Sequence, residues 1–205
     1  MRVSGPTILG VSSVLLGGAL PAQVTPASSL VGTWEAVARS EGGLGTTMTF
    51  GPDNSLSYTV GAMVDFKYRR VRDSLFIVDP EGRSTASRIR IAHDTLITFR
   101  HDGEQRETRV GAFSPGDSLV GIWTYPHYTG VAAYEAYAPA GDLHLRIPIR
   151  TLKGTFATQG DSAVLHLPGP GGGDRAVHFA VVADTLLLVW NGQTNRYLKA
   201  QQLGR

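Results

Sequence analysis

The sequence predicts an all-β protein made of short antiparallel strands. Gly, Pro, Asp and Asn recur about every 8–12 residues between apolar or alternating runs, and helical periodicity is nearly absent. The 25 Gly and 11 Pro of the 205 residues then serve mainly as turn residues. Because closing a sheet on itself removes its exposed edges, we expect the strands to form meander barrels.

A duplication predicts the number of barrels. The sequence Leu-Val-Gly-x-Trp at 30–34 recurs 89 residues later at 119–123, and Asp-Thr-Leu at 94–96 recurs 90 residues later at 184–186. Such a constant offset indicates an internal repeat. We therefore expect two tandem antiparallel meander barrels of about eight strands each, lipocalin-like in size and order. One merged or swapped barrel, in which strands of both units mix, is the alternative. The expected units are 30–113 and 119–205, with a linker at 114–118.

The turn residues divide each unit into short strands. In the first unit the expected strands are 32–39, 45–50, 55–60, 63–71, 74–78, 84–92, 94–101 and 105–111. In the second unit they are 121–125, 132–138, 142–148, 151–158, 162–167, 175–183, 184–190 and 194–200. Asp102-Gly103 and Asn191-Gly192 separate the last two strands of each unit. Both dipeptides accept the positive φ angles of a two-residue hairpin turn.

The first 22 residues are expected to be a signal peptide. Arg2 supplies a positive start, residues 8–20 are apolar with small residues throughout, and Ala22 precedes a suitable cleavage point. A second suitable point follows Ala27. Residues 23–29 then form an N-terminal linker. We therefore expect an exported protein, periplasmic or extracellular, and the absence of Cys excludes both disulfides and a lipid anchor on cysteine.

Composition excludes several classes of function. A formal net charge of +2, with acids and bases interspersed, argues against a nucleic-acid partner, and no segment after the leader is apolar enough for a membrane span. Serine lies in turn contexts and not in a nucleophile elbow, while Asp and Glu mostly occupy turn positions. We therefore predict no enzyme activity, no catalytic residue and no cofactor.

The Gly-x-Trp near the start of each unit resembles the lipocalin and lipocalin-like superfamily. In that family the Trp closes one end of the barrel, and a base from the last strand packs across its ring. The resemblance pairs Arg109 with Trp34 and Lys199 with Trp123 as structural residues, each pair worth ~0.5–2 kcal/mol. It implies small barrels like those of exported bacterial proteins. Each unit is about half the usual length, so side chains can fill the interior in place of a ligand.

Tyr125–Gly130 is the most distinctive loop of the sequence. It follows the second Trp, where lipocalin-like barrels have a loop that can cover the open end. Tyrosine and histidine pack apolar surface while offering a hydrogen bond, so the candidate ligand-binding residues are Tyr125, His127, Tyr128 and Tyr134. The alternative is an aromatic loop that packs onto its own barrel.

The six histidines offer one candidate pair. If the Gly-rich loop is symmetric about Gly172, Leu165 lies opposite Phe179 on a buried face. The same register places His166 beside His178 on the opposite face, as a candidate metal pair or pH-sensitive pair. No further ligand is evident, so no metal is assigned, and an exposed pair without function is the alternative.

These observations lead to one expected function and one alternative. The expected function is binding of a small hydrophobic molecule in a barrel, with the second unit favoured because of its Tyr-His loop. The alternative is a structural or interaction module of the cell envelope, with barrels filled by side chains.

Overall fold

The structure is a computed structural model that describes residues 27–111 and 118–200. The expected signal peptide, most of the expected N-terminal linker and most of the expected linker at 114–118 lie outside the described residues. After a 3₁₀ turn, η1 (Ala27–Ser29), the chain forms fourteen strands. They are β1 (Gly32–Ala36), β2 (Leu44–Phe50), β3 (Ser55–Val71), β4 (Ser74–Val78), β5 (Ser84–Ala92), β6 (Thr95–Arg100), β7 (Gly103–Val110), β8 (Gly121–Pro126), β9 (Ala132–Tyr137), β10 (Asp142–Gln159), β11 (Ser162–Leu167), β12 (Gly173–Val182), β13 (Thr185–Trp190) and β14 (Gln193–Lys199).

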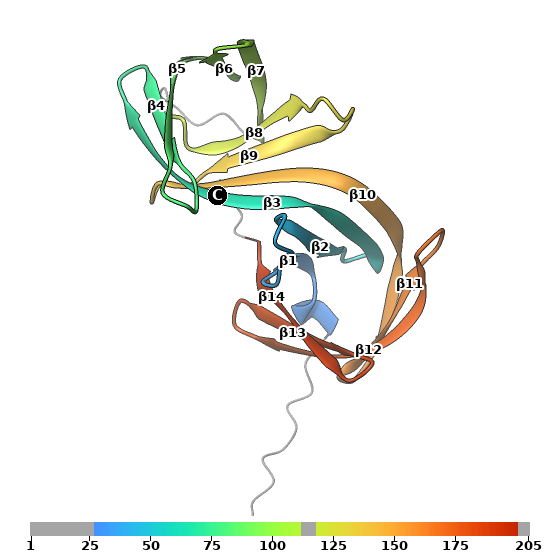
Figure 1. The fold of residues 1–205 in the computed structure, drawn as a ribbon. Helices are drawn as coiled ribbons and strands as arrows, with labels where there is room; N and C mark the ends of the chain where they lie inside the picture. The colour runs from blue at the N-terminus through green and yellow to red at the C-terminus, as the bar shows by residue number, and fades with distance from the viewer. Residues whose placement is uncertain (1–26, 112–117, 201–205) are drawn as a thin grey trace, which may run out of the picture.

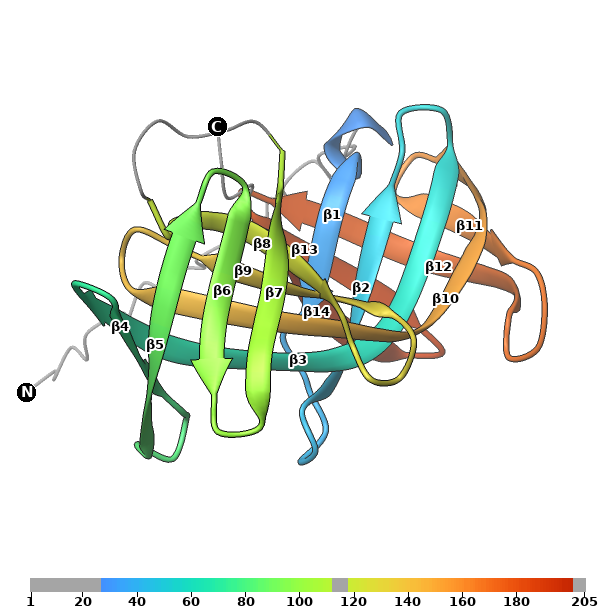
Figure 2. The ribbon, with the colours of Figure 1, turned by 90° about the horizontal axis from the view of Figure 1, so that it is seen from above.

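All fourteen strands belong to one antiparallel, ring-like sheet. Each strand pairs with its neighbours in the sequence, and β1 pairs with β14 to close the ring. The two longest strands, β3 and β10, also pair with each other across the ring. This pairing divides the ring into two lobes, which lie on either side of the long β3–β10 ribbon in Figure 1 and toward its two ends in Figure 2. The prediction of an all-β antiparallel protein is confirmed.

Each lobe combines strands from both sequence repeats. The first half of β3 pairs with β2 and its second half with β4, while β10 pairs first with β9 and then with β11. The lobe around Trp34, here the Trp34 lobe, therefore contains β1, β2 and β11–β14. The lobe around Trp123, the Trp123 lobe, contains β4–β9. Two separate tandem barrels, one per repeat, are not confirmed, and the strand pairing follows the mixed alternative.

The mixing follows from two turns that do not form. The sequence predicts strand breaks at 61–62 and 149–150, but β3 and β10 run straight through both places. Gly61 lies opposite Pro148, and a Cβ on Gly61 would lie 2.5 Å from the carbonyl oxygen of Ile147. Ile149 is left out of the register as a bulge and is 62% exposed. A glycine, a proline and a bulge thus mark a close strand crossing and not a chain reversal.

Two separate cores fill the lobes, and each surrounds a buried tryptophan. Trp34 and Trp123 are fully buried, and their indole N–H groups donate to the carbonyl oxygens of Leu30 and Leu119 at 2.7 and 2.8 Å. Because a buried indole N–H needs an acceptor, the repeated Leu-x-x-x-Trp spacing builds the same local structure twice. The Trp34 core also contains Met48, Phe50, Leu56, Phe156, Leu165, Leu167, Phe179, Leu186, Leu188 and Tyr197. The Trp123 core also contains Leu75, Ile89, Leu96, Tyr137 and Leu143.

The tryptophan–base pairs are exchanged relative to the prediction. Arg109 packs over Trp123, with its guanidinium carbon 4.1 Å from the ring centroid, and Lys199 packs over Trp34 at 5.4 Å. The predicted pairing, within each repeat, is wrong because each lobe takes its first strand from one repeat and its last strand from the other. Arg109 is the more tightly held base, since it also donates to the carbonyl oxygens of Val120 and Ser118 at 2.9 and 2.6 Å.

Local turn predictions are correct in one hairpin and displaced in another. Asn191 and Gly192 form the two-residue loop between β13 and β14, with φ angles of 49° and 74°. In the β6–β7 hairpin, Arg100 pairs with Gly103, so the loop consists of His101 and Asp102. Asp102-Gly103 is therefore not the central pair of that turn.

Candidate functional site

Each lobe has a cavity, and both cavities lie on the same side of the buried tryptophan of their lobe. Ala36 and Ala38 follow Trp34 by two and four residues and line the cavity of the Trp34 lobe. Tyr125 and His127 follow Trp123 by the same spacing and line the cavity of the Trp123 lobe. The buried tryptophan thus lies toward one end of each lobe, and these cavities lie further along the strands.

The Trp34-lobe cavity has a volume of about 310 Å³ and mostly apolar walls. Its inner walls come from inward-facing side chains of several strands of the lobe, including Tyr58, Leu165, Val177 and Leu188. Arg175 and Trp190 lie on its lining, with the guanidinium 4.7 Å from the ring centroid. An apolar wall with a few polar groups is the usual composition of a small-molecule pocket.

The Trp123-lobe cavity has a volume of about 500 Å³ and a more polar lining. It lies between the predicted Tyr-His loop, which connects β8 and β9, and the β6–β7 hairpin. The ring of His127 packs 4.2 Å from that of Tyr128, and its Nδ1 lies 2.8 Å from the hydroxyl of Thr129. Tyr128 is 93% exposed, so it does not pack onto its own barrel.

The four predicted ligand-binding residues do not share one cavity. Tyr125, His127 and Tyr128 line the cavity of the Trp123 lobe. Tyr134 lies on the outward face of β9, because its neighbours Ala133 and Glu135 are the buried residues of that strand. Tyr134 lines a different cavity, between the lobes.

A layer of buried carboxyl groups lies beneath the Trp123-lobe cavity. Glu107 on β7 is 1% exposed and Glu135 on β9 is 6% exposed. The cavity-lining Gln105 donates to Oε1 of Glu107 at 2.9 Å, and the hydroxyl of Tyr137 donates to Oε2 of Glu135 at 2.6 Å. Within the described part of the chain, Oε2 of Glu107 is buried and has no hydrogen-bond partner.

Burial changes the acidity of this whole layer. Burial, and then the adjacent carboxyl of Glu135, raise the pKa of Glu107 to about 8, although Gln105 and nearby positive charge oppose the shift. Burial also raises the pKa of Glu135. Burial and the same two carboxyls raise the pKa of Tyr125 to about 12. Glu107 is therefore largely a neutral acid at pH 7, and an approaching positive charge would favour its ionised form.

Sequence reasoning missed this layer, although the strand pattern contained a signal for it. Because most acidic residues lie at turn positions, the two that lie inside strands, Glu107 and Glu135, were not singled out. The resemblance predicts that Arg109 packs across an indole, so its side chain must face inward. Because strand side chains alternate, Glu107 two residues earlier must face inward as well.

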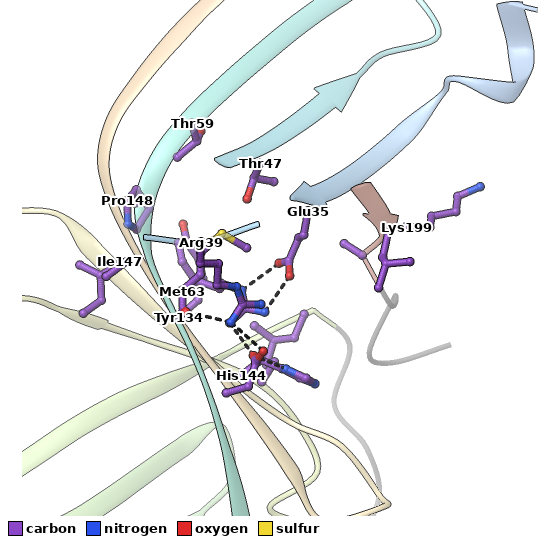
Figure 3. Close-up of a pocket in the computed structure, with 18 residues that line it drawn as sticks. Glu35, Arg39, Thr47, Thr59, Met63, Tyr134, His144, Ile147, Pro148 and Lys199 are labelled. Carbon is purple, nitrogen blue, oxygen red and sulfur yellow. Dashed lines mark hydrogen bonds and ion pairs between the residues drawn. The ribbon is translucent and has the colours of Figure 1, made fainter. Parts of the chain in front are cut away.

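A third cavity, the waist groove, lies between the lobes on the outer surface of the sheet. It has a volume of about 480 Å³ and contains an ion-pair network centred on Arg146 (Figure 3). Arg146 donates to both carboxylate oxygens of Glu35 at 2.9 and 2.7 Å and to Asp65 at 2.9 Å. Asp65 also pairs with Arg39 and His144, both at 2.8 Å.

The network joins three strands that are far apart in the sequence. Glu35 lies on β1, Asp65 on β3 and Arg146 on β10. Although burial opposes ionisation, hydrogen bonds from His144 and the charge and hydrogen bond of Arg146 hold the pKa of Asp65 well below its usual range. All three guanidinium nitrogens of Arg146 already donate to protein acceptors. This network therefore holds the crossing together and leaves Arg146 little capacity for a ligand.

The predicted histidine pair is not formed. On β11 and β12, His166 lies opposite Asp174 and hydrogen-bonds to it, while His178 lies opposite Ser162. The loop is centred on Pro170 and not on Gly172, so the register differs by four residues from the prediction. Both imidazoles still face away from the core, as predicted. Within the described ranges, no group of three or more His, Asp or Glu side chains is placed to hold a metal ion.

Comparison with known proteins found no matching family model, curated protein or solved structure. The lipocalin-like resemblance therefore stays a prediction from the two Trp motifs. In the described part of the chain, no helix has the length and apolar character needed to cross a membrane.

Proposed function

We propose that this protein is an exported binding protein that holds a small apolar molecule in the Trp34-lobe cavity. The observation that carries the proposal is the apolar wall of that cavity, which inward-facing side chains of the barrel form at its open end. Burial of apolar ligand surface against such a wall gains roughly 25 cal/mol per Å². The signal-like N-terminus supports a role outside the cytoplasm.

The Trp34 lobe suits an apolar ligand better than the lobe with the Tyr-His loop. The Trp123-lobe cavity lies over buried carboxyls, and an apolar ligand there would leave Oε2 of Glu107 without a partner. Burying a polar group without a partner costs about 1–3 kcal/mol. The Trp34-lobe cavity has instead Leu165, Val177 and Leu188 at its base.

Fluorescence titration of the full chain with 1-decanol tests the proposal. Trp190 lies on the cavity lining and serves as the reporter, so we expect a saturable change in emission. Val60→Phe adds bulk to the lining and is expected to weaken binding at least tenfold. Val164→Phe is the matched control, because Val164 is 47% exposed on β11 and lines none of the three cavities.

Two results would contradict the proposal. One is the absence of a saturable response in the unchanged protein. The other is equal affinity in the Val60→Phe and Val164→Phe variants. Either result would favour the alternative function, an interaction module whose barrels hold no ligand.

A further inference from the structure

The acidic layer of the Trp123 lobe is not required by the fold. The Trp34 lobe provides a comparison within the same molecule, because equivalent positions follow from strand register. Trp34 lies opposite Met48, whereas Trp123 lies opposite Glu135. Two residues before the base that covers each indole, the Trp34 lobe has Tyr197 and the Trp123 lobe has Glu107.

A third position of the layer shows the same difference. Leu188 and Thr98 occupy the corresponding sites on β13 and β6, two residues after the buried Leu186 and Leu96. One lobe thus completes this layer with leucine, methionine and tyrosine, while the other uses threonine and two glutamates. Because the Trp34 lobe fills the same layer without acidic side chains, the two glutamates of the Trp123 lobe are not needed for packing.

One carboxyl oxygen of the layer has no hydrogen-bond partner. Glu107 and Glu135 interact electrostatically inside the lobe. Gln105 and Thr98 favour the ionised form of Glu107, and Tyr137 donates to Glu135. Oε2 of Glu107 is nevertheless buried without a partner among the described residues. Native proteins rarely leave such an atom unpaired, because its desolvation is uncompensated.

The cavity above the layer shares two side chains with it. Gln105 contributes to the cavity lining and to the hydrogen bond on Glu107, so the two sites share a wall. Tyr125 lies on the lining and interacts electrostatically with both carboxyls. The rings of His127 and Tyr128 pack together at the exposed side. A ligand that enters here meets the rings of His127 and Tyr128 first. Glu107 and Glu135 do not line the cavity themselves, so its polar end must pass Gln105 and Tyr125 to reach them. Arg100 also lines the cavity.

We propose that the Trp123 lobe binds a small organic cation, a primary amine on an aromatic body, with its ammonium group on Glu107 and Glu135. An ammonium group supplies three N–H donors and a positive charge, which matches one unpaired oxygen and two adjacent carboxyls. The aromatic body lies against the rings of His127 and Tyr128 at the opening, where stacked or edge-to-face ring pairs are favourable. A carboxylate ligand offers only acceptor oxygens, so it cannot donate to the unpaired oxygen of Glu107. A bare metal ion lacks a third acidic or imidazole ligand among the described residues.

Other charged and titratable groups surround Glu107 and Glu135 and affect their ionisation. Arg100 on β6 acts on both carboxyls and favours their ionised forms. Tyr125 and Tyr137 face the pair from β8 and β9, and Tyr68 on β3 packs edge-on against Tyr137. Arg109 lies over Trp123, further along β7. Because Glu107 holds a proton when the site is empty, binding of an amine is expected to release protons into solution.

Calorimetric titration of the full chain with 2-phenylethylamine, 2-phenylethanol and phenylacetate at pH 8 tests the proposal. We expect the amine to bind at least tenfold more tightly than the neutral alcohol and the acid not to bind. Heats measured in two buffers of different ionisation enthalpy should show proton release. Glu107→Gln should remove the preference for the amine, whereas Glu81→Gln, an exposed carboxyl on the β4–β5 turn, should keep it.

The outcomes separate this proposal from the apolar site of the other lobe. Equal affinity for the amine and the alcohol overturns it, as does an unchanged preference in Glu107→Gln. Failure of all three compounds to bind also overturns it. None of these results affects the 1-decanol titration, which reports on Trp190 in the Trp34 lobe. The amine–alcohol comparison in the unchanged protein decides the proposal even where a variant fails to fold.

Discussion

Replacing Glu107 with glutamine should change how stability depends on pH. Glu107 has a pKa of about 8 in the folded protein, against 4.5 for an ordinary Glu. The folded state therefore binds a proton more tightly than the unfolded state, and stability falls as pH rises from 4.5 to 8. At about 1.4 kcal/mol per pH unit, the loss from this carboxyl is roughly 5 kcal/mol over that interval. The amide of the Glu107→Gln variant does not titrate, so the variant should lose much less.

Urea unfolding at pH 5, 6, 7 and 8 measures this difference. We expect the midpoint of the unchanged protein to fall steadily with pH, and the midpoint of Glu107→Gln to fall with a clearly smaller slope. A residual slope is expected, because burial also raises the pKa of Glu135. Glu81→Gln should behave as the unchanged protein. A midpoint that stays level or rises between pH 5 and 8 in the unchanged protein would refute the reasoning.

Three further predictions concern packing and the crossing. Arg109→Met should lower the free energy of unfolding by about 3 kcal/mol, because two charge-assisted hydrogen bonds and an indole contact are lost. Lys199→Met should lower it by less than about 1 kcal/mol, and urea unfolding of both variants measures the difference. Arg146→Met should cost about 3 kcal/mol by calorimetry, because it leaves two partly buried carboxylates without their cation, and a loss below about 1 kcal/mol would contradict this role. Gly154→Ala should prevent normal folding, since its Cβ would lie 1.8 Å from a main-chain carbonyl oxygen of β11. At Gly42 the added Cβ would contact only the Ser40 hydroxyl, at 3.9 Å, so Gly42→Ala should keep the circular dichroism spectrum.

Sequence patterns predicted the strands much better than their partners. The alternation of buried and exposed residues is set locally, so β7, β11 and β12 appear close to their expected places. The sequence pattern does not determine whether a strand pairs within its own repeat or with the other repeat. Both repeats offer nearly the same pattern of inward side chains, so pairing within a repeat and pairing across repeats satisfy the same local rules.

The pairing across repeats depends on two short sites at which local sequence rules predicted a turn and the structure has a continuous strand. Gly61 and Ile149 lie at the two predicted strand breaks, 61–62 and 149–150, and a turn at each place would have allowed separate barrels. Their actual role is set by contacts between β3 and β10, whose paired residues are 75 to 100 positions apart in sequence. The acidic layer was missed for a related reason, because Glu107 and Glu135 come together only through strands of different repeats.

The pairing of β1 with β14 has a consequence for the order of assembly. During synthesis from the N-terminus, β1 and β2 emerge first, yet the Trp34 core also needs β11–β14. Strands β4–β9, by contrast, are consecutive, and most of the Trp123 core comes from them. Contacts between residues distant in sequence form slowly, because closing a long loop costs entropy before any contact repays it. The Trp34 core therefore cannot be completed until β14 has left the ribosome, long after β1 and β2 have been synthesised.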